Sequence, residues 1–405
     1  MCTFLARAAG FAFPFLSFRL AELGFSTRMA GLVLAAFGAG WLVGSIVCGA
    51  AADRIGRRTT LVATMGTAAT VLPLLAAAST PAAALAAAAV VGALYDAHRP
   101  IVSAVIQDQV ASEQDRARIG GARHFAVNAA AATTGAVGGW LAPATGIDVL
   151  LLINAAACLL VALIAAAALP ADSRTAAPSP GRGPAPRRTA LRDVRLWLVC
   201  LASLAALTAC VGMFSSLPML MARDGLSAAS YGWTQAATAV VVVAATPLLM
   251  SVLTRRAARP TAMVGPLALS SLILGTGMGA AGFADTTAQY SAAAMVTVVG
   301  EIILFTAASD IVNRISPPDG RGLYAGVWGA QLAIAIIAAP LLSAWTLDAG
   351  GELFTAAAVL ATGVLGALLC LPLHALLPHH SVRTPACLPP SCSSAPEPAA
   401  ATASR

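Results

Sequence analysis

Twelve apolar runs, each long enough to cross a lipid bilayer, constrain this chain more than any other feature of its sequence. A membrane-spanning helix needs about 20 mainly apolar residues, because the hydrocarbon core is about 30 Å thick and a helix rises about 1.5 Å per residue. The sequence therefore predicts an all-α integral membrane protein with twelve transmembrane helices. The runs lie near residues 2–21, 29–52, 60–79, 81–106, 120–142, 147–169, 196–221, 227–253, 261–281, 288–313, 322–345 and 351–376.

The composition agrees with a lipid-exposed surface. Only 10% of the 405 residues are charged, whereas about a quarter are charged in a typical soluble domain. Small residues are abundant, with 35 glycines, and they let membrane helices approach closely. The eight cysteines show neither metal-ligand spacing nor a secreted disulfide framework, so we predict no metal site and no cofactor.

The arginines predict the orientation of the chain. All 24 basic residues are arginine, and if the loop after the second run is cytoplasmic, only Arg19, Arg28 and Arg223 lie in loops on the outer side. Arg7 and Arg99 fall inside runs, and the other 19 lie in cytoplasmic loops or the C-terminal tail. This asymmetry follows the positive-inside rule and places both termini in the cytoplasm. It also explains the net charge of +7 without nucleic-acid binding.

The chain divides into two similar halves. We predict an N-terminal six-helix half (1–170), a cytoplasmic Pro-, Gly- and Arg-rich linker (171–194), a C-terminal six-helix half (195–376) and a disordered cytoplasmic tail (377–405). Gly24-Phe25-Ser26 reappears as Gly225-Leu226-Ser227, and each serine is expected to cap the next helix. Two halves in parallel order predict a pseudo-two-fold axis along the membrane normal, with a solute site between them.

The most specific motif follows the second run and reads Gly49-Ala50-Ala51-Ala52-Asp53-Arg54-Ile55-Gly56-Arg57-Arg58. Gly49 allows close helix approach, and Gly56 permits a tight turn. Asp53 is able to neutralise a helix N-terminus or an arginine. The alternative interpretation is an ordinary positive-inside loop that happens to contain these residues.

This motif, in this loop of a twelve-span chain, resembles the signature loop of the major facilitator superfamily, and the resemblance covers roughly residues 1–376. It implies that the loop is a gate that holds the outward-open state. Asp53 would engage the start of the eleventh run near Arg321 and Gly322. The arginines of the loop would meet Asp108 after the fourth run. The equivalent loop of the second half, 254–259, keeps arginines but lacks the aspartate, so we assign it no gate.

Weaker elements resemble the drug:proton antiporter branch of that superfamily. The fifth run contains a helix-packing motif, Gly135, Gly138 and Gly139, although Gly135 stands where the branch has proline. Ordinary small-residue packing is an equal alternative for this segment. The arginine usual in the fourth span is also missing, since alanine occupies the region of Ala88. Relatives carry a polar segment before the first span, so the resemblance implies a start upstream of Met1.

Charges inside the runs are the candidate proton or substrate ligands, because a charge in the bilayer interior is costly. Glu301 lies near the middle of the tenth run, Asp96 and Arg99 lie in the fourth, and Arg7 lies in the first. Desolvation disfavours a charged carboxyl, so we expect Glu301 to exchange a proton near neutral pH. The alternatives are a fixed hydrogen bond at Glu301, a proton carried by Asp96, and a structural ion pair among Arg7, Asp96 and Arg99.

These features favour a secondary active transporter of the cell membrane that exports drug-like or amphipathic solutes in exchange for protons. A proton-coupled importer of a metabolite such as a sugar or organic acid is the alternative. The expected partners are a small-molecule substrate, protons and the lipid bilayer, and we expect a monomer. A receptor would need a soluble signalling domain, and an ATP-driven pump would need a phosphate-binding loop; neither pattern occurs. No arrangement of residues predicts an enzyme.

Overall fold

The computed structural model describes residues 2–95, 133–169, 191–256, 261–317 and 321–377, together with residues 101, 102, 112, 119, 130 and 131. Asp96, Arg99 and Asp108, which the sequence singled out, lie outside the described residues. Across the described part of the chain, the regular structure is helical and contains no strand. The predicted all-α fold class is therefore confirmed.

The first part of the chain forms six labelled helices. They are α1 (Cys2–Ala8), α2 (Ala12–Glu22), α3 (Thr27–Ile55), α4 (Arg57–Ala77), α5 (Pro81–Tyr95) and α8 (Ile147–Ala168). Residues 133–145 are also helical. The first predicted span is thus divided into two helices, α1 and α2, instead of one.

The second part of the chain repeats this plan. Its helices are α10 (Val194–Gly212), α11 (Ser216–Arg223), α12 (Ala228–Arg256), α13 (Val264–Ala280), the short 3₁₀ helix η1 (Ala281–Phe283), α14 (Thr287–Ile315) and α15 (Arg321–Leu376). The seventh span is divided into α10 and α11. The α15 helix bends at Gly351, where φ is 72°, so it contains both the eleventh and the twelfth predicted spans.

The helix lengths are consistent with the twelve predicted spans. Among the described residues, nine helical segments are long and apolar enough to cross a membrane, and the longest, Leu323–Leu376, has 54 residues and folds back at Gly351. The fourth span is represented by the shorter apolar helix Pro81–Tyr95. The protein is therefore a multi-pass membrane protein.

The turns that follow the first span of each half have the same backbone conformation. Gly24 has a φ of 74° and Gly225 a φ of 73°, a left-handed conformation that glycine adopts without steric cost. Two residues later, the Ser26 hydroxyl accepts the Met29 N–H, and the Ser227 hydroxyl accepts the Ser230 N–H. Both predicted serine caps are confirmed.

Two ion pairs follow the same repeat, although the sequence analysis did not predict them. Arg19 of α2 binds Asp148 at the start of α8, with 2.6 Å between Nε and Oδ1. Arg223 of α11 lies 3.6 Å from Glu352 at the start of the last span. Arg19 to Arg223 and Asp148 to Glu352 are both 204 residues. Each pair joins the sixth span of its half to the short helix that follows the break.

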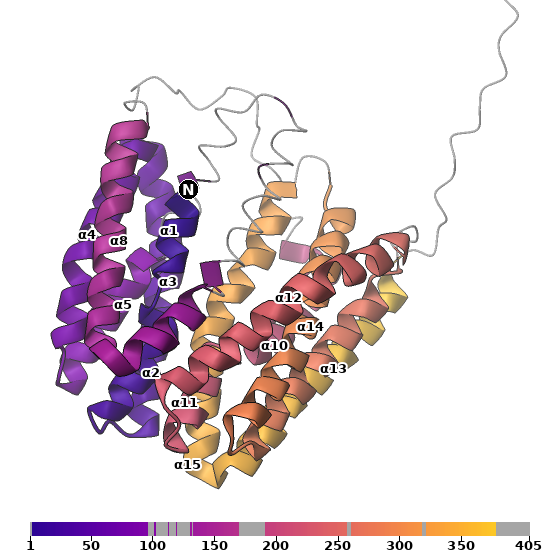
Figure 1. The fold of residues 1–405 in the computed structure, drawn as a ribbon. Coiled ribbons are helices and arrows are strands. Elements are labelled where there is room, and N and C mark those ends of the chain that lie inside the picture. Colours follow the sequence, from indigo (N-terminus) through magenta and orange to yellow (C-terminus); the bar gives the residue numbers. More distant parts are fainter. Residues whose placement is uncertain are drawn as a thin grey trace, which may run out of the picture.

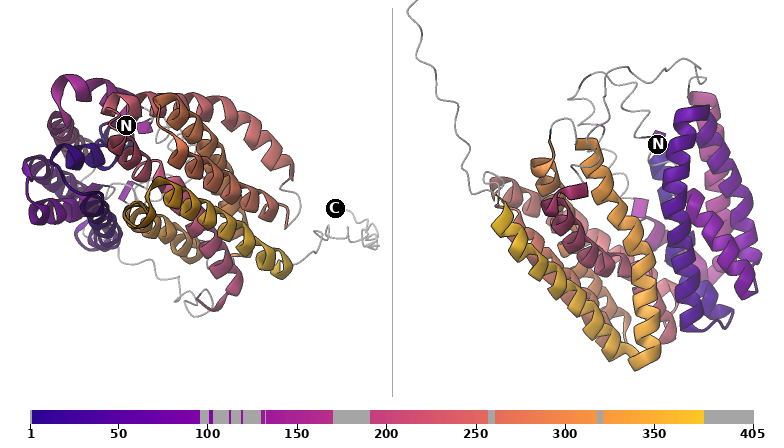
Figure 2. Two further views of the ribbon diagram at one scale, coloured as in Figure 1. Left: turned by 90° about the horizontal axis from the view of Figure 1, so that it is seen from below. Right: turned by 180° about the vertical axis from the view of Figure 1, so that it is seen from behind.

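The helices form two bundles that meet near one end of the molecule. In Figure 1 the bundle of α1–α5 and α8 lies beside the bundle of α10–α15, and the two converge at α2, α11 and the bend of α15. The right-hand view of Figure 2 shows the same divergence toward the opposite end. We call the convergent end the predicted outer end, and the end with Gly56 the predicted cytoplasmic end.

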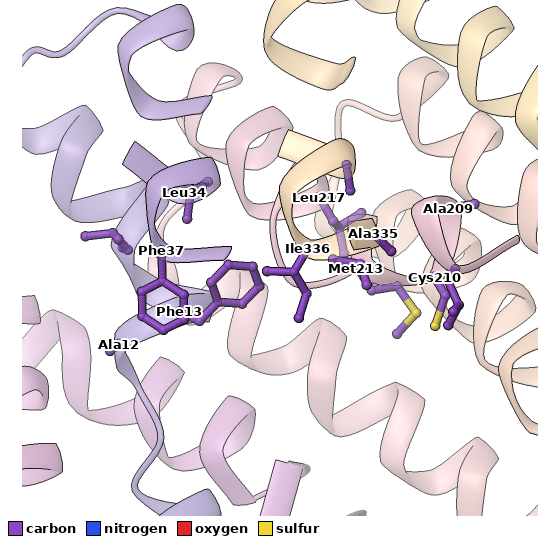
Figure 3. Packing of buried hydrophobic residues seen from close by; sticks show 14 of the residues in the cluster. Ala12, Phe13, Leu34, Phe37, Ala209, Cys210, Met213, Leu217, Ala335 and Ile336 are labelled. Carbon is purple, nitrogen blue, oxygen red and sulfur yellow. The ribbon is translucent and has the colours of Figure 1, made fainter. Parts of the chain in front are cut away.

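Small residues allow the close approach at the predicted outer end. A Cβ added to Gly31 or Gly38 of α3 would collide with Ala344 or Ile336 of α15. A Cβ at Gly139 would collide with Gly232 of α12. Figure 3 shows Phe13 and Phe37 of the first bundle lying toward Ile336 of the second, within one buried hydrophobic cluster.

The same two helices are separate at the predicted cytoplasmic end. Gly49 of α3 and both Gly326 and Gly329 of α15 have open space where a Cβ would stand. The α3–α15 seam is therefore tightly packed toward the predicted outer end, whereas these three glycines have no close neighbour toward the predicted cytoplasmic end.

We predict that Gly139→Leu opens the predicted outer end, because a leucine side chain cannot fit against Gly232. A Leu217→Cys marker, which is fully buried in α11, should then react with an impermeant maleimide at least about tenfold faster, the equivalent of about 1.4 kcal/mol. Gly66→Leu is the matched control, since Gly66 has open space around it. Equal labelling in both variants would contradict the packing role of Gly139.

The two ion pairs should differ in strength. Arg19 is only 16% exposed, donates to the Ala76 carbonyl as well, and makes the shorter contact, whereas Arg223 is 44% exposed. We expect Arg19→Gln to reduce the free energy of unfolding by about 1–2 kcal/mol and Arg223→Gln by less than about 1 kcal/mol. Thermal unfolding of the purified variants in detergent measures the difference. A larger loss at Arg223 would contradict this ranking.

Candidate functional site

The break between α1 and α2 exposes backbone groups in the middle of the bundle. Pro14 has no N–H, so the Gly10 carbonyl, four residues earlier, lacks its helical donor. The Tyr95 hydroxyl of α5 donates to that carbonyl at 2.8 Å. A Cβ at Gly10 would lie 2.7 Å from the Tyr95 hydroxyl oxygen, so a larger residue at this position would displace the hydroxyl from its hydrogen bond.

Two further side chains satisfy the other backbone groups at this break. The Thr134 hydroxyl donates to the Arg7 carbonyl at 2.6 Å and lies 3.1 Å from the Ala8 carbonyl. The Asn154 side-chain oxygen of α8 accepts the Ala12 N–H at 3.3 Å. Side chains from three helices of the first bundle therefore fix the backbone conformation of the break between α1 and α2.

The break between α10 and α11 occupies the equivalent place in the second bundle. Pro218 follows this break, as Pro14 follows the first, and the two prolines are 204 residues apart. The Tyr231 hydroxyl of α12 donates to the Met213 carbonyl at 3.4 Å, and the Ser216 and Ser343 hydroxyls are 2.6 Å apart. Non-helical backbone inside a membrane is found where transporters bind their solutes, so the two breaks mark the candidate site.

Aromatic rings surround Tyr95 on the side of the first bundle. Its ring centroid lies 5.2 Å from that of Phe37 and 5.9 Å from that of Trp41. The Arg7 guanidinium carbon stands 5.8 Å from the Tyr95 centroid, a cation–π distance. Arg7, predicted as a substrate or proton ligand, is therefore beside the break in α1–α2. Its proposed companions Asp96 and Arg99 are outside the described residues.

Tyr231 carries the aromatic contacts between the bundles. Its centroid is 5.6 Å from that of Phe15 and 5.9 Å from that of Phe18, both in α2. All three rings are buried. They close the route toward the predicted outer end with apolar surface.

Glu301 lies on α14, on the side that faces α10. Its carboxyl is close enough to the Cys210 thiol of α10 to act on it electrostatically. One turn further along α14, Phe305 meets Trp328 of α15 with 6.2 Å between centroids. Glu301 is partly buried, and among the described residues its carboxyl has no hydrogen-bond or ion-pair partner.

Polar side chains of α10 and α15 also lie in the interior of the second bundle. The Trp328 indole N–H donates to the Ser203 hydroxyl at 3.1 Å, and Gln331 lies one turn further along α15, near the Cys200 thiol. The second bundle thus presents an acid, an amide and an indole in its interior. The sequence analysis named only the acid. A single tryptophan or glutamine in an apolar run does not show whether its side chain points to the interior of the bundle or to lipid.

Gln235 of α12 is a residue that the sequence analysis missed. Its side chain is 5% exposed and lies against Gly135 in the first bundle. Its amide is near the Tyr231 hydroxyl, yet no described residue is in hydrogen-bonding geometry with Nε2. A buried amide without a partner costs about 1–3 kcal/mol. No sequence pattern shows that this glutamine faces the opposite bundle.

The predicted packing motif lies on the boundary between the bundles. Gly135 faces Gln235 and Gly139 faces Gly232, both of α12, while Gly138 faces Phe11 and Phe15. Gly135 and Gly139 therefore belong to the contact that closes the predicted outer end, whereas Gly138 packs within the first bundle.

The predicted gating loop lies at the other end of the molecule. Gly49, Asp53 and Arg54 belong to the last turns of α3, Gly56 forms the turn with a φ of 97°, and Arg57 begins α4. The Arg58 side chain donates to the Ala166 carbonyl in the last turn of α8, where a cation is favoured by the helix dipole. The side chain of Asp53 and the residue Asp108 are outside the described set, so their roles remain predictions.

A cluster at the predicted cytoplasmic end joins α10 to α15. Asp193 caps α10 by accepting the Arg195 N–H at 3.0 Å, and the Tyr324 hydroxyl of α15 donates to its other oxygen at 3.0 Å. Partial burial alone would raise the pKa of Asp193, but the hydrogen bonds from Arg195 and Tyr324 outweigh burial and lower the pKa. The cluster fixes the start of α15 to its own bundle.

Similar folds occur among solved transporter structures. The nucleoside transporter NupG is 14% identical, with a TM-score of 0.69, and the match covers 92% of this chain and 96% of that chain. A point mutant of the same transporter has a TM-score of 0.67 at 14% identity, with 92% and 98% covered. A POT family transporter in complex with 5-aminolevulinic acid has a TM-score of 0.71 at 12% identity, with 93% and 95% covered. At these identities the likeness shows the fold alone.

No curated protein matches this sequence significantly. The family model described as Major Facilitator Superfamily, however, matches residues 1–222 and again residues 199–391. The two overlapping matches cover both bundles and nearly the whole chain. This protein belongs to the Major Facilitator Superfamily of membrane transporters.

Proposed function

We propose that this transporter exports drug-like or amphipathic solutes in exchange for protons, and that Glu301 is the carboxylate that carries the proton. The observation that supports this assignment is the isolation of Glu301. It lies in the middle of a long membrane helix with no hydrogen-bond or ion-pair partner among the described residues. An acid that held two helices together by a fixed hydrogen bond would have such a partner.

Coupling follows from competition for one carboxylate. A cationic solute that binds beside ionised Glu301 disfavours its protonated form, so the solute expels the proton to the side that the site faces. When the site opens to the more acidic side, a proton binds and the solute leaves. Phe305, one turn from Glu301 on α14, and Trp328 of α15, which it contacts, supply aromatic surface for a cation or a planar ring.

Uptake of a polar metabolite is the second candidate. The Trp328–Ser203 hydrogen bond and the neighbouring Gln331 place polar groups in the interior of the second bundle, and the rings around Tyr95 are suited to a planar base or sugar face. One structural neighbour is named a nucleoside transporter. Accumulation of a compound panel in cells with and without the protein, repeated with a protonophore, distinguishes export from uptake and tests proton coupling.

We further propose that the protein functions as a monomer in the cell membrane with both termini in the cytoplasm. The arginine distribution supports this orientation. In this orientation the inner part of the α3–α15 seam, where Gly49, Gly326 and Gly329 have no close neighbour, faces the cytoplasm. The gating loop 49–58 would then close that seam when the transporter faces outward.

Glu301→Gln should abolish the pH dependence of transport and leave the amount of folded protein unchanged. Glutamine keeps the size of the side chain but neither gains nor loses a proton. Transport by purified protein in vesicles, measured across a series of imposed pH gradients, provides the test. If Glu301→Gln transports with the same pH dependence as the natural protein, Asp96 becomes the better candidate.

Asp310→Asn is the matched control for Glu301→Gln, because it changes the same chemical group on the same helix. Asp310 is paired with Arg314 at 2.6 Å near the end of α14. Its replacement should leave the pH dependence intact. Equal effects of the two variants would show that any loss of charge on α14 disturbs transport, and would remove the specific role of Glu301.

Asp53→Asn should slow transport sharply at a normal membrane level of the protein. Removal of the charge takes away the partner of the α15 N-terminus in the outward-open state, so that state should lose about 1–2 kcal/mol. Arg255→Gln, in the corresponding loop of the second half, is the control and should transport normally. Normal transport by Asp53→Asn would show that the loop acts only as an orientation signal.

A further inference from the structure

Two seams join the bundles toward the predicted outer end. One is the α3–α15 seam, where Gly31 packs against Ala344. The other, which we call the α12 seam, lies between the helical residues 133–145 and α12, where Gly232 packs against Gly139. Gly31 and Gly232 are 201 residues apart in the repeat, and their partners are 205 residues apart. The two seams therefore follow one plan, and a difference between them is specific to one side of the molecule.

The seams differ one turn further into the membrane. There α3 has Leu34, which is fully buried and belongs to the hydrophobic cluster seen in Figure 3. Gln235 of α12 stands at the equivalent place, 201 residues later. Burial stabilises an apolar side chain, whereas a buried amide gives up hydrogen bonds with water and needs a partner in the protein. Closure of the outer end therefore has different energetics at the two seams.

The α12 seam encloses the Gln235 amide without pairing it. The stem of this side chain lies directly over Gly135, since a Cβ added to that glycine would fall 2.2 Å from the Gln235 Cβ. The side chain is 5% exposed, and its Nε2 donates to no described residue. The buried Thr238 hydroxyl, one turn along, donates to the Gln235 main-chain carbonyl at 2.8 Å. Closure thus removes water from the amide nitrogen and supplies no acceptor in its place.

The α12 helix is held to its own bundle independently of this seam. The fully buried Thr234 hydroxyl lies 3.1 Å from the Ser291 hydroxyl of α14. Trp140 and Trp233, which follow the two facing glycines in the sequence, are largely exposed, so the seam lies at the lipid-facing surface of the molecule. Residues 133–145 can therefore move away from α12 without disturbing the contact between α12 and α14.

We propose that the outer closure loosens at the α12 seam while the α3–α15 seam stays packed, and that the unpaired Gln235 amide is the cause. When residues 133–145 move away from α12, water reaches the amide and restores its hydrogen bonds. Leu34, at the equivalent place in the other seam, gains nothing from contact with water. Gln235 is therefore a positioning residue that sets how often the outer end opens. This role depends neither on the solute nor on proton exchange.

Two cysteine markers at equivalent places distinguish the seams. Ala142 lies one turn beyond Gly139, Leu347 lies one turn beyond Ala344, and both are buried. Ala142→Cys or Leu347→Cys is introduced into the full-length protein after its eight natural cysteines are replaced by alanine. Maleimide labelling in detergent is then scaled to the rate of the same protein after denaturation. We expect Ala142→Cys to label several-fold faster than Leu347→Cys.

Gln235→Met keeps the length of the side chain and removes its polar groups. It should slow labelling at Ala142→Cys by about tenfold, as expected when a buried unpaired amide is removed, and leave labelling at Leu347→Cys unchanged. Thr238→Val is the matched control on the same helix, because its hydroxyl has a partner, and it should slow neither marker. Leu34→Gln transfers the amide to the other seam and should speed labelling at Leu347→Cys several-fold.

Equal slowing at both markers in Gln235→Met would show that the outer end opens as one body, and would overturn the proposal. Unchanged labelling in Gln235→Met, or an equal effect of Thr238→Val, would overturn it too. The unfolding temperature of each variant shows whether its fold is intact. If Gln235→Met does not fold, Leu34→Gln decides, and unchanged labelling at Leu347→Cys then contradicts the proposal. No part of this test measures transport, so failure of the proton-exchange proposal would leave its outcome intact.

Discussion

The constraint on which the structure depends is the need to satisfy backbone hydrogen bonds inside the membrane. A continuous helix does so without outside help, but the first and seventh spans are interrupted at Gly10 and near Met213. Unpaired carbonyls in hydrocarbon are costly. Tyr95 and Tyr231, each from another helix, donate to the carbonyls at these breaks. The interruptions are therefore fixed parts of the fold.

The two breaks separate the short helices α2 and α11 from the rest of their spans, and these helices make contacts both within and between the bundles. Each is tied to the sixth span of its own bundle by an ion pair at the same offset in the repeat. Each also packs against the other across the predicted outer end. The ion pairs lie within bundles and the packing lies between them, so the bundles can separate there without breaking either ion pair.

Sequence patterns predicted the parts of this fold that depend on hydrophobic length and local backbone chemistry. The apolar runs predicted the helices, and the repeated Gly-x-Ser pattern predicted the turns at Gly24 and Gly225 and the serine caps that follow them. The motif at Gly49–Arg58 and its resemblance identified the superfamily that the family model also matches.

The residues that the sequence did not reveal are those whose role depends on which way their side chains point. Tyr95, Gln235 and Trp328 stand in apolar runs with few polar neighbours, and sequence alone does not show that they face the centre. The ion pairs join residues more than a hundred positions apart. Pro14 and Pro218, 204 residues apart, were the available signal for the breaks.

The balance between inward and outward conformations follows from what holds the predicted outer end together. Glycine contacts such as Gly139 against Gly232 contribute dispersion, which is weak for each atom pair. The unpaired Gln235 amide and Ser17 hydroxyl, buried at the same boundary, oppose closure. To shift a two-state equilibrium from 1:99 to 99:1 requires about 5.5 kcal/mol of differential binding. A closure held mainly by dispersion and weakened by two unpaired polar groups presents little resistance to such a shift. Under the proposed mechanism, proton binding at Glu301 together with solute binding would supply this difference.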